Sequence, residues 1–148
     1  MKEKLLLVGA GGFGRMVAEQ AMLQYDCAFV DDGQPVGDEI CGIPVIGGVD
    51  DLPELRKEYS LLVVGIGNNR FRAQVYEKAK ALGFAFPNIV APSAYISPFS
   101  EVGCGCVLMQ NWSALRPRAA NCAEYSFRVS SRSPFLSAPF CAPVAIRP

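Results

Sequence analysis

The sequence contains no histidine, no C-x-x-C pair and no long apolar run. Six cysteines without paired spacing, in a chain that lacks histidine, argue against a zinc site or a redox site. No apolar stretch reaches the roughly 18–20 residues that would span a bilayer. The chain is therefore not expected to bind a metal or to cross a membrane.

Charge of one sign is also not in excess, because 14 basic residues balance 14 acidic residues. A net charge of zero argues against a nucleic-acid surface. The balance is uneven along the chain: residues 1–111 carry nine bases and thirteen acids, whereas residues 112–148 carry five arginines and one acid. A hydrophobic fraction of 51% and a charged fraction of 19% are typical of a globular protein. The apolar start leads into glycines rather than into a cleavage site, which favours a first strand and a cytoplasmic protein.

Strand and helix signals alternate up to about residue 90. Strands are predicted for the apolar runs at 5–8, 28–30 and 61–64, with a shorter extended piece at 43–46. A helix is expected after each of the first and last runs, the latter ending at Gly83, and Asp51 is expected to cap a short helix. This rhythm predicts an α/β fold with a Rossmann-like parallel sheet and right-handed crossovers over residues 1–91.

From residue 92 to 111 the rhythm changes. Ile96, Val102 and Leu108 recur every six residues, with small side chains at Ser100 and Cys106. This spacing is typical of hexapeptide repeats in a left-handed parallel β-helix, in which each aliphatic side chain points to the axis. An apolar loop or an antiparallel hairpin is the alternative.

The last segment, residues 112–148, contains neither lysine nor glycine and holds five of the eleven prolines. Proline lacks a backbone donor and interrupts regular structure. We predict an irregular, disordered tail there. An arginine-rich arm for an anionic partner is the alternative.

The first motif with chemical content is the glycine-rich turn at residues 9–14, which matches G-x-G-x-x-G between a strand and a helix. Glycines allow a ligand close to the backbone, and the start of the helix attracts a phosphate. Asp31 follows Gly9 by 22 residues, where dinucleotide-binding folds place an acid for ribose hydroxyls. The turn therefore predicts an anion site, with a tight turn that binds nothing as the alternative.

The second motif, residues 65–70, follows the third strand and should lie at the same sheet edge as the glycine turn and residues 31–32. Ligands of open α/β sheets bind outside that edge. Asn68 and Asn69 are candidates for hydrogen bonds to a base or sugar, and Arg70 for balancing a pyrophosphate. A turn with a helix cap and a solvated arginine is the alternative.

Five segments together carry a resemblance to a known family: residues 7–15, 29–32, 42–47, 65–69 and 90–97. In order and spacing, over residues 4 to about 111, the chain resembles the sialic-acid O-acetyltransferase and UDP-bacillosamine N-acetyltransferase family (NeuD/PglD type). The resemblance implies a Rossmann-like domain for the nucleotide-sugar acceptor. It also implies a β-helix that forms homotrimers, binds acetyl-CoA between subunits and supplies a catalytic histidine.

Carried over by position, the resemblance assigns substrate-binding roles to ten residues. It implies phosphate contacts for the glycine turn, uridine or ribose contacts for the aspartates, and further acceptor contacts for the second motif. Those residues are Gly9, Gly11, Gly12, Gly14, Asp31, Asp32, Gly67, Asn68 and Asn69, to which Arg70 is added from its position alone.

The departures from the family concern catalysis. The family's histidine acts as general base, and this chain has none, so no catalytic residue is assigned. Most of the β-helix pattern is also missing, so we expect no bound acetyl-CoA, no stable trimer and negligible acetyl transfer by this chain alone. The tail composition suggests that the C-terminal part is missing or frameshifted. The predicted function is thus acceptor binding for a sugar O- or N-acetyltransferase.

Two other functional classes remain open. One is an NAD(P)-binding oxidoreductase, which the glycine turn and Asp31 favour but the short chain does not. The other is a non-catalytic nucleotide-binding module.

Overall fold

The computed structural model describes residues 1–96, 98, 102, 104–110 and 113–114. The chain forms two compact units, Met1–Pro87 and Asn88–Pro148. The glycine turn, both aspartates and the second motif all belong to the first unit.

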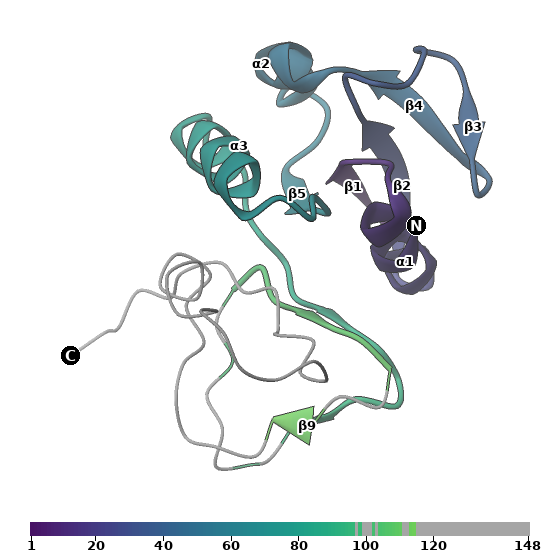
Figure 1. Ribbon diagram of the computed structural model, residues 1–148, viewed down its shortest axis with the longest axis vertical. Coiled ribbons are helices and arrows are strands. Elements are labelled where there is room, and N and C mark those ends of the chain that lie inside the picture. Colours follow the sequence, from purple (N-terminus) through teal and green to yellow (C-terminus); the bar gives the residue numbers. More distant parts are fainter. Residues whose placement is uncertain (97, 99–101, 103, 111–112, 115–148) are drawn as a thin grey trace. The chain divides into compact units, whose positions relative to one another are not determined.

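A five-stranded sheet forms the centre of the first unit (Figure 1). Its spatial order is β3-β4-β2-β1-β5. β1 pairs in parallel with β2 and β5, β2 pairs in parallel with β4, and only β3 is antiparallel, to β4. The strands are β1 (Glu3–Val8), β2 (Tyr25–Val30), β3 (Glu39–Ile40), β4 (Ile43–Gly47) and β5 (Leu61–Val64). The predicted α/β fold with a mainly parallel, Rossmann-like sheet is confirmed, and the piece at 43–46 is a full strand.

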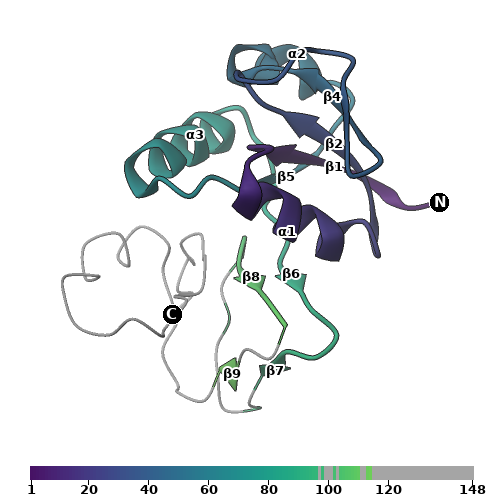
Figure 2. The same cartoon turned by 45° about the vertical axis from the view of Figure 1, so that its right-hand side comes forward.

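Helices cover both faces of this sheet (Figures 1 and 2). The helices are α1 (Gly12–Ala21), the 3-10 turn η1 (Val49–Asp51), α2 (Leu52–Leu55) and α3 (Asn69–Ala81). Strand side chains alternate between faces. Leu6 and Val8 therefore pack in one apolar cluster with Leu52 of α2 and Val75 of α3, while α1 lies on the opposite face.

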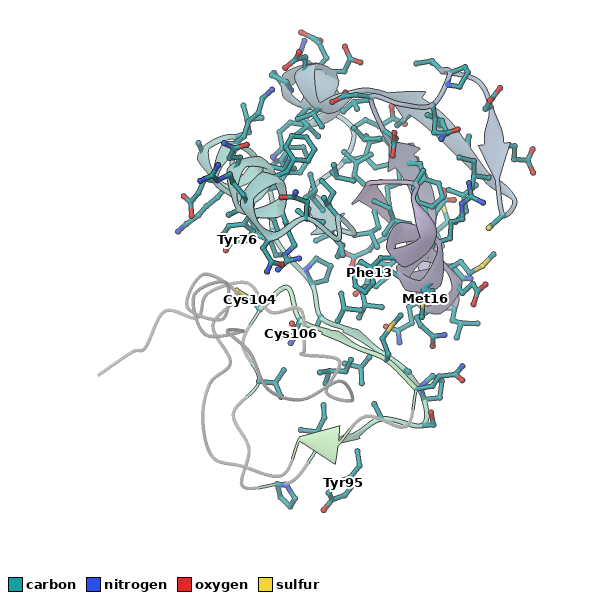
Figure 3. The ribbon with its side chains drawn as sticks, in the orientation of Figure 1. Phe13, Met16, Tyr76, Tyr95, Cys104 and Cys106 are labelled. Carbon is teal, nitrogen blue, oxygen red and sulfur yellow. The ribbon has the colours of Figure 1, made fainter. Side chains whose placement is uncertain are left out.

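Aromatic packing closes the α3 side of the unit. The rings of Tyr76, labelled in Figure 3, and Phe86 lie with their centroids 4.3 Å apart.

The helix α1 has one exposed and one buried side. Met16 of α1 is more than half exposed, at 53%. The buried side of α1 carries Val17 and Ala18.

The predicted stop at Gly83 is confirmed by its hydrogen bonds. Gly83 has φ +83°, its N–H donates to the Lys80 carbonyl at 3.0 Å, and the Phe84 N–H donates to the Ala79 carbonyl at 3.1 Å. These two bonds form a Schellman motif, which satisfies carbonyls at the end of α3.

The predicted capping role of Asp51 is wrong. Its carboxylate accepts a hydrogen bond from the Gly48 N–H at 2.8 Å, so it points back over η1 rather than forward onto α2. The reason is the 3-10 turn, which places Asp51 at the end of one helical turn before the next begins. Pro53 does lie in the first turn of α2, as expected.

The second unit contains two pairs of short parallel strands. β6 (Ile89–Val90) pairs with β8 (Val107–Leu108), and β7 (Tyr95–Ile96) pairs with β9 (Ser113–Ala114). In both pairs the partners are 18 residues apart, because Ile89 faces Val107 and Tyr95 faces Ser113. An offset of three six-residue steps is what one turn of a hexapeptide coil requires.

Burial within this second unit is uneven. Leu108 is buried and Val102 is half-buried, whereas Ile96 is 37% exposed. The Asn88 side chain accepts a hydrogen bond from the Cys106 N–H at 2.9 Å, which joins the residues that precede β6 and β8. Apart from β9, the predicted tail at 112–148 lies outside the described residues, as does Ser100.

The described residues include no helix that is long and apolar enough to cross a membrane. In the same part of the chain, no group of three or more cysteine, aspartate or glutamate side chains could hold a metal ion.

Candidate functional site at the carboxyl edge of the sheet

The site lies where the strand order reverses. From β1 the chain moves through α1 to β2 on one side, and it later returns to β5 on the other side of β1. β1 and β5 are adjacent strands, and the turns that follow them lead to opposite sides of the sheet. In open α/β sheets this switch point is the place where ligands bind.

Close contact between three glycines holds the two turns together. A Cβ atom on Gly14 would lie 1.8 Å from the Gly9 carbonyl oxygen and 3.2 Å from the Gly65 carbonyl oxygen. Gly9 has φ +101°, and its N–H donates to the Val30 carbonyl at 2.9 Å. Packing alone thus requires glycine at 9 and 14, and their predicted phosphate contacts stay a prediction.

Three other glycines have no such packing reason. Cβ atoms on Gly11, Gly12 and Gly67 would meet no atom within 4 Å, and none of the three has a positive φ. All three residues are exposed. Neither packing nor backbone conformation requires glycine at these three positions. Because the space around them is empty, a ligand can approach their backbones closely.

Asp31 organises the glycine turn through both of its carboxylate oxygens. Oδ2 accepts a hydrogen bond from the Ala10 N–H at 2.6 Å, and Oδ1 accepts one from the Gly33 N–H at 2.7 Å. The first bond ties the end of β2 to the turn after β1. A carboxylate oxygen can accept a second bond, so the predicted ribose contact is compatible with this role.

Asp32 connects the ends of β2 and β4 in a similar way. Its Oδ1 accepts a hydrogen bond from the Val49 N–H at 2.8 Å. A Cβ atom on Gly48 would lie 2.5 Å from the same oxygen, so a larger residue there would displace the Asp32 carboxylate from this contact. The sequence indicated Asp32 as a ligand contact but not as a support for the β4 turn.

The second motif is held by an arginine that the sequence analysis overlooked. Asn68 is the N-cap of α3, and its side chain accepts a hydrogen bond from the Phe71 N–H at 3.0 Å. Arg72 donates from Nη2 to Asn69 Oδ1 at 2.7 Å and from Nη1 to the Ile66 carbonyl at 3.1 Å. The signal for finding Arg72 was its spacing of three residues from Asn69 at a helix start.

Two exposed arginines bring positive charge to the edge. Arg15, in the first turns of α1, donates from Nε to the Ala10 carbonyl at 3.0 Å. Arg70, which the sequence analysis selected, is exposed at the start of α3. The structure therefore brings all ten predicted residues to the ends of β1, β2 and β5, and adds Arg15 and Arg72.

A Rossmann-like α/β domain is the class that this sheet order and these glycine turns define. Residues 4–79 match the family model of the PglD N-terminal domain. The chain belongs to this family, which confirms the resemblance stated from the five sequence segments.

Solved structures of sugar acetyltransferases are similar to this chain. One is a mutant of perosamine N-acetyltransferase from Caulobacter crescentus in complex with CoA and GDP-perosamine, at 31% identity and a TM-score of 0.73, covering 80% of this chain and 57% of that one. Another is the acetyltransferase domain of PglB from Neisseria gonorrhoeae FA1090 in complex with acetyl coenzyme A, at 40% identity and a TM-score of 0.68, covering 76% and 56%. The chain thus spans somewhat more than half of these relatives.

Proposed function

We propose that the carboxyl edge of β1, β2, β4 and β5 binds a nucleotide sugar, the acceptor of a sugar O- or N-acetyltransferase. The observation that carries this proposal is the open space at Gly11, Gly12 and Gly67. A ligand at the switch point can therefore contact the backbone of the turn after β1 and of the turn after β5 without a steric clash.

The charge and dipoles of the edge favour a diphosphate. The first turn of α1 contains no acidic side chain, and its N-terminal end attracts anions. Arg15 and Arg70 are exposed nearby and can balance negative charge. The structure of the Caulobacter relative with GDP-perosamine supports a nucleotide sugar as the ligand class.

Acetyl transfer is not proposed for this chain by itself. The chain has no histidine, which is the general base that the family resemblance implies. We propose that the parallel pairs with an 18-residue offset are the start of the left-handed β-helix. The related PglB domain binds acetyl coenzyme A, but we do not expect this chain to bind it, to form a stable trimer or to catalyse acetyl transfer. A cytoplasmic location stays a prediction.

Thermal melting of the full chain with ligands tests the proposal. A ligand that binds only the folded state at a hundredfold excess over Kd adds roughly 2.7 kcal/mol to the free energy of unfolding. We expect a UDP-sugar or a GDP-sugar to raise the melting temperature and NAD to leave it unchanged. A shift with NAD alone would instead favour an NAD(P)-binding oxidoreductase domain.

The matched variant is Gly11→Ala. Gly11 has an extended backbone, with φ −71° and ψ −175°, and open space around it. Alanine lowers the entropy of the unfolded chain but is a poorer N-cap for α1 than glycine, so the ligand-free melting temperature should change little. The shift that the nucleotide sugar causes should be reduced. An undiminished shift would contradict the placement of the ligand against this turn.

A further inference from the structure

The two asparagines of the second motif have their amide oxygens engaged by the protein. The Phe71 N–H donates to the Asn68 side chain, and the Arg72 guanidinium donates to the Asn69 side chain. A backbone N–H and a guanidinium can only donate. The atom that faces each of them must therefore be Oδ1, which fixes the orientation of both amide groups.

The opposite atoms of both amides are donors that point away from these contacts. Asn68 and Asn69 are exposed, and within the described ranges no protein group accepts a hydrogen bond from either Nδ2. The carbonyl of Ile66, a further acceptor in this turn, is engaged by Arg72 at 3.1 Å. What residues 66–69 offer to a ligand is thus a set of donors beside the open backbone of Gly67.

We infer that residues 66–69 bind the diphosphate of the ligand through the Nδ2 groups of Asn68 and Asn69, and that Arg72 is a positioning residue for Asn69. The inference rests on the proposed function and specifies its chemistry. Phosphate oxygens are strong acceptors that cannot donate when ionised, so they match a surface that presents donors.

Arg72 acts on the ligand indirectly, chiefly through the Asn69 amide that it orients. Its fork bridges the Ile66 carbonyl and Asn69 Oδ1, so it fixes both the turn and the side chain. Without it, the Asn69 amide can rotate and present its oxygen, which repels a phosphate. Lysine carries the same charge but lacks the planar fork, and it would replace only one of the two bonds.

The test uses isosteric substitutions in the full chain. Asn68→Asp and Asn69→Asp keep the oxygen that accepts from the protein and replace the Nδ2 donor by a second, negatively charged oxygen. Gln74→Glu, at an exposed position on α3, is the control for the added charge. Calorimetric titration with UDP and GDP, compared with uridine and guanosine, separates diphosphate contacts from base contacts.

We expect each aspartate variant to weaken binding of UDP or GDP, whichever the unsubstituted chain binds more tightly, by roughly tenfold or more. This is the loss expected for one hydrogen bond to a charged group. The ligand-free melting temperature, nucleoside binding and Gln74→Glu should stay as in the unsubstituted chain. Arg72→Met should weaken diphosphate binding and Arg72→Lys should recover part of it. In the Arg72→Met background, Asn69→Asp should cost less, because both act through one amide.

Two results would overturn the inference alone: diphosphate binding that Asn69→Asp leaves unchanged, or nucleoside binding that falls equally. Losses for Arg72→Met and Asn69→Asp that simply add would overturn the positioning role. If the unsubstituted chain bound no UDP, GDP or sugar conjugate of either, the proposed function would fail, and this inference with it.

Discussion

Replacing Gly14 by alanine should destabilise the first unit strongly. The new Cβ would lie 1.8 Å from the carbonyl oxygen of Gly9 and 2.7 Å from its carbonyl carbon. Both atoms belong to the backbone, so no side chain can rotate away and the backbone of the glycine turn must shift. Overpacking in a core costs about 1–3 kcal/mol, and we expect at least the upper value here. For a unit of this size, about 3 kcal/mol corresponds to a loss of roughly 12–24 °C in melting temperature.

Gly12→Ala is the matched control two residues earlier. Its Cβ would meet no atom within 4 Å, and Gly12 is the first residue of α1. Alanine there reduces the entropy of the unfolded chain and should raise stability by about 0.4–1 kcal/mol. Urea unfolding and circular dichroism melts of both variants measure the difference. Equal stability of the two would refute the packing account of the glycine turn.

The remaining predictions concern Asp31 and Cys27. Asp31→Asn removes one of two acceptors and turns an amide N–H₂ toward a backbone N–H, which should cost about 1–3 kcal/mol in urea unfolding; an unchanged midpoint would contradict this. Burial raises the pKa of the Cys27 thiol to about 11. Because the thiolate is the nucleophile, Cys27 should react with iodoacetamide at pH 8 roughly a hundredfold more slowly than an ordinary thiol. Mass spectrometry should show the rate rising until about pH 11, and a plateau near pH 9 would be inconsistent.

Local patterns determined most of the first unit. The apolar runs at 5–8 and 61–64 became β1 and β5 because continuous apolar residues suit strands that helices cover on both faces. Gly83 ended α3 because only glycine adopts its left-handed conformation without strain. The short antiparallel β3 was missed, since two residues carry too little periodicity.

The second unit shows where local spacing stops being informative. Six-residue spacing indicated Ile96, Val102 and Leu108, but the pairing partners of β6 and β7 lie 18 residues along the chain. A six-residue period gives an 18-residue offset between paired strands only if three repeats make one full turn of the coil. The sequence alone left an apolar loop or an antiparallel hairpin open as alternatives, and the parallel pairing of the described strands agrees with neither.

The candidate site divides in the same way between sequence and tertiary structure. The sequence by itself determined which turns reach the carboxyl edge, because parallel strands end on one side of a sheet. Tertiary structure decided what each residue does there. Glycines that read alike in the motif separate into Gly14, which packs against Gly65 across the switch point, and Gly12, which faces open space. The physical reason is that contacts across the switch point join residues more than fifty positions apart, and local spacing carries no record of them.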